Sequence, residues 1–203
     1  MATSFTLQND PALPQGYLKV DGSTSATFTT SGITGNLVGN VTGSLTSGGS
    51  LTLRTAQTAP FTAPNTYADF TGIPSWAKRI TVMFSGVSVS GTSNLQVQLG
   101  DSGGIEISGY IATSQSISAA TSSTSGFIFT QSSVAVDFWH GLMIISAINS
   151  NSWAYTAMAN NNGSVRTSAG TKTLSDTLTS IRITTVNGTD TFDAGTINIS
   201  YEG

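Results

Sequence analysis

Apolar residues at every second position are the feature that most restricts what this chain can fold into. Beyond residue 66 they recur in short runs, and no stretch keeps the period of a helix. The first three runs lie at 80–84, 95–99 and 105–111. Gly86 shifts the phase after the first run, as a β-bulge does. The other two flank a pair of glycines and predict a hairpin.

The pattern continues to the C-terminus. Further runs lie at 142–148, 153–157, 181–183 and 197–201, and the run at 142–148 is apolar on both faces. Turn segments rich in Asn and Gly separate the runs, at Asn149 to Ser152, Asn160 to Gly163, Asn187 to Asp190 and Asp193 to Gly195. About eight strands at this spacing predict an all-β fold, a jelly-roll-like antiparallel β-sandwich head over residues 66–203.

A short repeat precedes the head. Glycines recur every four residues at Gly35, Gly39 and Gly43, and an apolar line keeps the same period at Ile33, Leu37, Val41 and Leu45. Because Gly, Asn, Thr and Val are poor helix formers, a β-type filament is favoured over a helix. One copy has no partner layer for this line, so we expect three copies to wind into a trimeric shaft over residues 32–65, linker included. The alternative is a flexible Gly/Ser-rich linker.

The first 31 residues form a third region. Pro and Gly interrupt two short alternating runs there, and too few apolar residues are present to build a separate core. We therefore expect residues 1–31 to be an arm that becomes ordered by docking on another protein.

Charge is scarce in this chain. Charged residues make up 8% of it, against roughly 25% in average soluble domains. The net charge is −3 and the basic residues do not cluster, which argues against a nucleic-acid partner. The N-terminus does not resemble a secretory signal and no stretch predicts membrane insertion, so we expect synthesis in a cytoplasm. With no Cys, durability must come from packing or assembly.

Three segments of the head resemble a module of bacteriophage and prophage virion proteins. They are GIPSWAKRITVMF at 72–84, QLGDSGG at 98–104 and IRITTVNGTDTF at 181–192. The repeat at 33–45 also resembles shaft repeats of phage structural proteins. The resemblance implies a homotrimeric tail or head fibre displayed on the exterior of the virion, an arm that binds other virion proteins, and attachment to a host surface. It implies no catalytic motif.

Catalytic chemistry finds little support in the residues. His140 is the only imidazole, its setting predicts a turn, and no Ser stands in a nucleophile elbow. Five acidic residues are the candidates for a glycosidase pair or for calcium ligands, namely Asp101, Glu106, Asp137, Asp190 and Asp193. Those in Asn- or Gly-containing turns are expected to cap their own backbone. We therefore expect no enzyme, no cofactor and no metal site.

Aromatic residues are the remaining candidates for binding. Trp139, Trp153 and Tyr155 suit contact with a host glycan if their rings are exposed. For Trp153 and Tyr155, which share a strand face, burial against the opposite sheet is favoured. Trp76 is expected to staple the entrance to the first strand of the head. The main expectation is a non-enzymatic phage fibre, and the alternative is a calcium-assisted carbohydrate-binding β-sandwich module.

Overall fold

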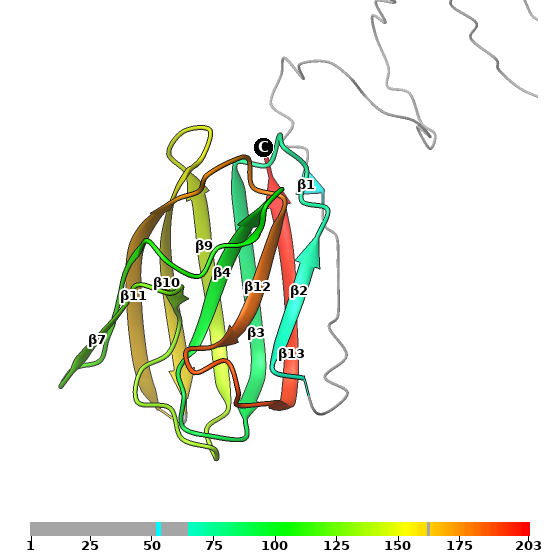
Figure 1. Ribbon diagram of the computed structural model, residues 1–203. Helices are drawn as coiled ribbons and strands as arrows, with labels where there is room; N and C mark the ends of the chain where they lie inside the picture. The colour runs from blue at the N-terminus through cyan, green and yellow to red at the C-terminus, as the bar shows by residue number, and fades with distance from the viewer. Residues whose placement is uncertain (1–51, 54–64, 162) are drawn as a thin grey trace, which may run out of the picture. The chain divides into compact units, whose positions relative to one another are not determined.

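The computed structural model describes residues 52–53, 65–161 and 163–203. These residues form no helix, and their strands make two antiparallel sheets that pack face to face (Figure 1). The predicted all-β sandwich is therefore confirmed. The predicted arm at 1–31, and the shaft residues Ile33, Leu37, Val41 and Leu45, lie outside the described residues.

The larger sheet has eight strands in the order β1-β13-β3-β9-β10-β11-β6-β7. Their bounds are β1 (Thr52–Leu53), β13 (Phe192–Glu202), β3 (Arg79–Val89), β9 (Trp139–Ala147), β10 (Ser152–Asn161), β11 (Ser164–Thr173), β6 (Tyr110–Gln115) and β7 (Ala120–Ser123). Because β1 pairs with β13, part of the predicted linker belongs to the sheet of the head.

The smaller sheet lies in front of the larger one in Figure 1 and has the order β2-β12-β4-β5, with β8 also paired to β4. Its strands are β2 (Tyr67–Thr71), β12 (Ser180–Thr185), β4 (Leu95–Asp101), β5 (Gly104–Ile105) and β8 (Phe127–Ile128). Both sheets bring a late strand beside an early one, since β13 pairs with β3 and β12 pairs with β2 and β4.

The core follows from the alternation seen in the sequence. On β3 the side chains of Ile80, Val82 and Phe84 are buried, and the residues between them face outward. Inward residues of β2, β4 and β12 in the smaller sheet close the other side of the same cluster. Phe84 stacks on Phe129 with ring centroids 4.0 Å apart. Each such side chain contributes about 1.5 to 3 kcal/mol when fully buried, so this layer dominates the stability of the head.

The predicted β-bulge is present on β3. Gly86 has a φ of 62°, and the register between β3 and β9 shifts between Phe84 and Val87. A positive φ is costly for residues with a Cβ, which explains the glycine. The backbone amide of Gly86 donates a hydrogen bond of 3.1 Å to Nδ1 of His140 on the neighbouring strand.

The predicted hairpin at 95–111 is only partly correct. β4 and β5 pair solely through Gly100 with Ile105 and Asp101 with Gly104. The chain then turns at Gly109, which has a φ of 75°, and crosses to the larger sheet as β6. Ile107 is left exposed in the crossing segment. The alternating apolar residues at 105–111 therefore belong to two strands, β5 and β6, which lie in different sheets. Alternation alone does not show where one strand ends and the next begins.

β4 is buried on both faces although two of its residues are glutamines. Gln98 donates through Nε2 to the carbonyl of Ser125 at 2.9 Å, and Oε1 of Gln96 accepts from the Ser125 hydroxyl at 3.1 Å. The segment before β8 therefore covers the outer face of β4 and satisfies its amides. Gly126 leaves room for this contact, because an added Cβ would lie 2.7 Å from Oε1 of Gln96 and the glutamine side chain would have to shift.

The loops gather at two ends of the sandwich. At the end that we call proximal, β1 pairs with the last residues of β13, Leu53 opposite Tyr201. At the distal end, Asn65 pairs with the first residue of β13, Phe192. The loops at 90–94, 130–138 and 187–191 also meet at the distal end, joined by bonds such as the Ser93 amide to Asp190.

Candidate functional site

The three aromatic residues proposed for glycan contact lie inside the sandwich. The exposed fractions of Trp139, Trp153 and Tyr155 are 1%, 3% and 4%. Tyr155 stacks on Phe127 with ring centroids 4.3 Å apart and donates its hydroxyl to the carbonyl of Ile128 at 3.1 Å. Burial raises the pKa of Tyr155. The burial favoured for Trp153 and Tyr155 is what the structure shows, and Trp139 is buried as well, so none of the three rings forms an exposed platform.

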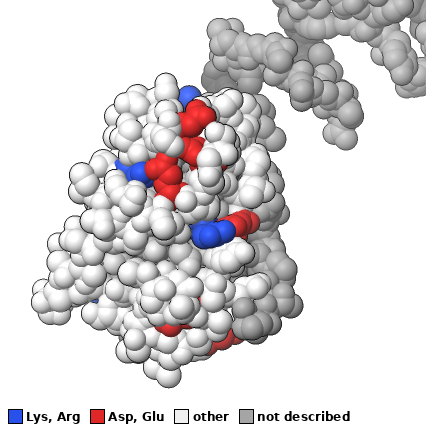
Figure 2. Space-filling model, in the orientation of Figure 1, with Lys and Arg blue, Asp and Glu red and all other residues white. Residues whose placement is uncertain are grey.

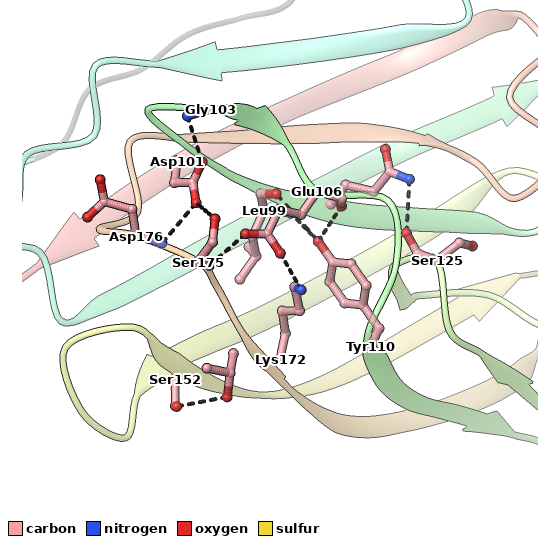
Figure 3. A network of polar contacts seen from close by, with 12 residues as sticks. Leu99, Asp101, Gly103, Glu106, Tyr110, Ser125, Ser152, Lys172, Ser175 and Asp176 are labelled. Atoms are coloured by element: carbon pink, nitrogen blue, oxygen red, sulfur yellow. Dashed lines mark hydrogen bonds and ion pairs between the residues drawn. The ribbon is translucent and has the colours of Figure 1, made fainter.

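Two of the candidate carboxylates come together at the proximal end (Figure 3). Asp101 ends β4, and Glu106 follows β5 after the short turn between them. Both face the loop that begins at Ser175. The Ser175 hydroxyl donates to Oδ2 of Asp101 at 2.6 Å, and the Ser175 amide donates to Oε1 of Glu106 at 2.7 Å. The Asp176 amide also donates to Oδ2 of Asp101, at 2.9 Å.

A buried lysine completes this network. Lys172 lies on the inner face of β11, in the larger sheet, and forms an ion pair with Oε2 of Glu106 from the smaller sheet. Its ammonium group also lies 5.2 Å from the centroid of the Tyr110 ring. We call Asp101, Glu106, Lys172 and Ser175 the proximal clamp, because their contacts tie the two sheets together.

Tyr110 extends the clamp into the backbone of β4. Its hydroxyl accepts from the Leu99 amide at 2.7 Å and donates to the Glu106 carbonyl at 3.0 Å. Leu99 lies between the stretches of β4 that pair with β8 and with β5, so no strand partner reaches its amide from this side. A side chain from the other sheet thus satisfies a buried donor. Burial raises the pKa of Tyr110 and keeps its hydroxyl neutral.

The electrostatics of the clamp favour a structural role. The hydrogen bond from Ser175, with that from the Gly103 amide, lowers the pKa of Asp101. Burial opposes the charge on Glu106, but the bonds from Lys172 and Ser175 outweigh it and lower its pKa as well. A glycosidase needs one carboxyl group with a raised pKa to act as the acid. Both groups here are held ionised.

The remaining acidic candidates are scattered. Asp137 accepts from the Val134 amide at 2.9 Å, as a turn cap does. Asp190 binds across loops instead, to the Ser93 amide at 2.9 Å and to the Asn187 side chain at 2.7 Å. Asp193 is exposed at the start of β13. The described part of the chain contains no group of three or more His, Cys, Asp or Glu side chains placed to hold a metal ion.

His140 belongs to a strand and not to the predicted turn. It lies near the start of β9, and its imidazole is the acceptor for the amide of the bulged Gly86. The imidazole therefore anchors the bulge. Trp76 agrees better with its prediction, because it packs on Tyr201 of the last strand with ring centroids 5.6 Å apart.

Sequence reasoning missed a second buried cation, Arg166 on the inner face of β11. Its Nε donates to the Gln131 carbonyl at 3.2 Å, and its Nη1 donates to the Ser164 hydroxyl at 2.8 Å. The guanidinium lies 5.8 Å from the centroid of the Trp139 ring. Most residues of β11 are small and polar, so its sequence does not alternate between apolar and polar residues. A cation at an inward position of such a strand is therefore not recognisable as buried.

Few charged side chains lie on the face of the smaller sheet (Figure 2). They form small separate groups on an otherwise neutral surface. One is the pair between Arg182 and Asp69, whose Nε and Oδ1 atoms are 2.7 Å apart. The described residues include no helix long and apolar enough to span a bilayer.

Removing the cation of the clamp should destabilise the head. Lys172→Met keeps most of the apolar stem but leaves the partly buried carboxylate of Glu106 without its partner. We expect the free energy of unfolding to fall by about 1 to 3 kcal/mol, measured by urea denaturation. The matched control is Arg182→Met, which breaks a more exposed ion pair and should cost less than about 1 kcal/mol. Equal losses in the two variants would contradict the clamp.

The clamp should also make the head sensitive to acid. The pKa values of Asp101 and Glu106 are lowered from ordinary values of 3.8 and 4.5, so the unfolded chain binds protons first as the pH falls. This stabilisation is present at neutral pH and is lost as the pH drops below about 4.5. In the double variant Asp101→Asn, Glu106→Gln, the free energy of unfolding should fall less steeply between about pH 5 and pH 3. Parallel curves for variant and parent, from urea denaturation at each pH, would refute the assignment.

The chain matches no protein-family model, no curated protein and no solved structure. Its function must therefore be inferred from its own residues.

Proposed function

We propose that this chain is a non-enzymatic structural fibre protein of a bacteriophage particle, a tail or head fibre that acts as a homotrimer. Residues 1–31 dock on other virion proteins, the repeat at 33–45 winds three copies together, and the sandwich is displayed on the outside of the particle. Synthesis takes place in the cytoplasm of the bacterial host.

One observation carries this proposal: a β-sandwich with few charges follows a four-residue apolar repeat that a single copy cannot bury. The sandwich supports it by its geometry as well. The preceding chain joins at the proximal end, where β1 pairs with the end of β13, and the loops of the distal end point away from this junction. A fibre head needs this polarity, with attachment at one end and a free surface at the other.

The chemistry of the head supports a role in contact rather than catalysis. Its paired carboxylates are ionised and bound to Lys172 and Ser175, and its imidazole holds a bulge. The distal loops carry exposed apolar side chains at Val134, Val136 and Phe138. Contact with a host-surface glycan or protein through these loops would gain from multivalency, because three heads per fibre raise the apparent affinity of a weak site.

The carbohydrate-binding module with bound calcium finds no supporting observation in the head. Its aromatic platform would consist of rings that are buried, and its metal site would need a ligand cluster that the described residues do not form.

Localisation on the particle is the direct test of the proposal. Phage particles purified from a host strain that carries this gene should contain the chain, detected by mass spectrometry. A gold-labelled antibody against the head should bind to projecting fibres in electron micrographs. If the chain occurs only in the lysate and never on purified particles, the proposal fails.

The repeat should control assembly. Replacing Leu37 and Val41 by Asp places charges on the apolar line, so the full-length variant should lose its trimer mass in light scattering after size exclusion. The head should still unfold cooperatively in urea, because its core lies in another part of the chain. A variant that keeps the trimer mass would show that the repeat is a linker.

A further inference from the structure

The outer face of the larger sheet, which points away from the smaller sheet, carries a row of exposed apolar side chains. Met83, Leu142 and Met158 are direct cross-strand partners on β3, β9 and β10. Their exposed fractions are 36%, 43% and 59%. Partners at such positions lie about 5 Å apart and touch, so the three side chains form one continuous row, which we call the outer row.

The sequence of β9 is that of a strand buried on both sides. Antiparallel strands with one face in water usually alternate cleanly between apolar and polar residues. Here Met143 and Ile145 fill the core, while Leu142 and Ile144 occupy the outward positions between them. Among the described residues no layer covers this outer side, and Leu142 remains 43% exposed. A strand with apolar residues on both faces is typical of a sheet that is covered on its outer face by a further layer of protein.

The rows beside the outer row carry no Asp, Glu, Lys or Arg, and His140, opposite Asn160, is their one titratable side chain among the described residues. One row contains Thr81, Ile144, Thr156 and Ala169 as successive cross-strand partners. Among the described strand residues that face outward from this sheet, charged side chains occur at the two ends: Arg79 and Glu202 are cross-strand partners at the proximal end, and Asp193 is exposed at the distal start of β13. The centres of protein interfaces are likewise poor in charge and enriched in Met.

From this geometry we infer that the outer face of the larger sheet is the surface through which copies of this chain pack together. The occupant is a second copy, because the centre of this face has no Asp, Glu, Lys or Arg and so offers no complement to a charged partner and no repulsion to its own kind. In the trimer the outer row of each head is turned toward its neighbours. The inference rests on the proposed function in one respect, the trimer, and adds the surface that forms it.

The chain path supports the same occupant. β1 forms the edge of this sheet, next to β13. Residues 46–51 separate Leu45, the last residue of the apolar repeat, from Thr52 of β1, and they span at most about 25 Å when fully extended. Copies joined through the repeat therefore hold their heads within contact distance, and tethering raises the effective concentration of one head around another.

Thiol labelling can test the surface cleanly, because the parent chain has no Cys. Met158→Cys and Ile107→Cys are made singly in the full-length chain. The parent residues are exposed to similar extents in one copy, 59% and 66%, but only Met158 belongs to the outer face. At micromolar concentration, iodoacetamide should label the thiol at 158 at least about tenfold more slowly than the thiol at 107, followed by intact mass. Equal rates would overturn the inference.

A charged substitution identifies what covers the face. When Leu142→Glu is added to the Met158→Cys variant, the thiol at 158 should be labelled as fast as the thiol of the Ile107→Cys control. When Ile107→Glu is added to Met158→Cys instead, labelling of the thiol at 158 should stay slow. Met83→Glu, on the neighbouring strand, tests the same row and should likewise speed labelling of the thiol at 158. Urea unfolding checks that the head of each variant is folded. Two results would overturn the inference, because each would show that the chain covers its own face. One is slow labelling of the thiol at 158 in a folded head that carries Leu142→Glu. The other is slow labelling of that thiol after dilution has made the chain monomeric. Localisation on the particle is independent of either result.

Discussion

The layer of apolar side chains between the two sheets is the interaction on which the rest of this protein depends. Ile80, Val82 and Phe84 from the larger sheet and their partners from the smaller one are almost fully excluded from water. With so few charges and no disulfide, no other interaction in the head is large enough to hold the sheets together. The polar contacts are placed where that layer ends, at the loops and at the strand edges.

The crossing of the chain between the sheets shows how the polar contacts serve the core. Between β5 and β6 the backbone leaves one sheet for the other, which exposes donors and acceptors that no ladder satisfies. Tyr110 supplies a partner for two such groups, the Leu99 amide and the Glu106 carbonyl. Lys172 and Ser175 bind the side chain of Glu106 in the crossing segment. The bonds from Lys172 and Ser175 lower the pKa values of Glu106 and Asp101, so these two of the five acidic candidates stabilise the fold as carboxylates.

Local pattern predicted the strands well and the long-range contacts poorly. The period of two located β3, β4 and β12, and Gly86 located the bulge, because each of these depends on residues close in sequence. The pairing of Glu106 with Lys172 joins distant strands and has no local signal. The residues around His140 predict a turn, but pairing with β10 places His140 and Gly141 in β9. Trp139 is of a residue type suited to glycan contact, but its side chain is buried, and its local sequence does not reveal this.

The order of the strands has a consequence for biosynthesis. β3 is among the first strands of the head to leave the ribosome, yet its neighbour on one side is β13, formed by residues 192–202. The smaller sheet likewise places β12 between β2 and β4. Neither sheet can close until nearly the whole polypeptide has been translated, so the nascent head must stay open and rely on slow, distant pairing. A copy cut short by premature termination would lack the strand that joins β1 to β3.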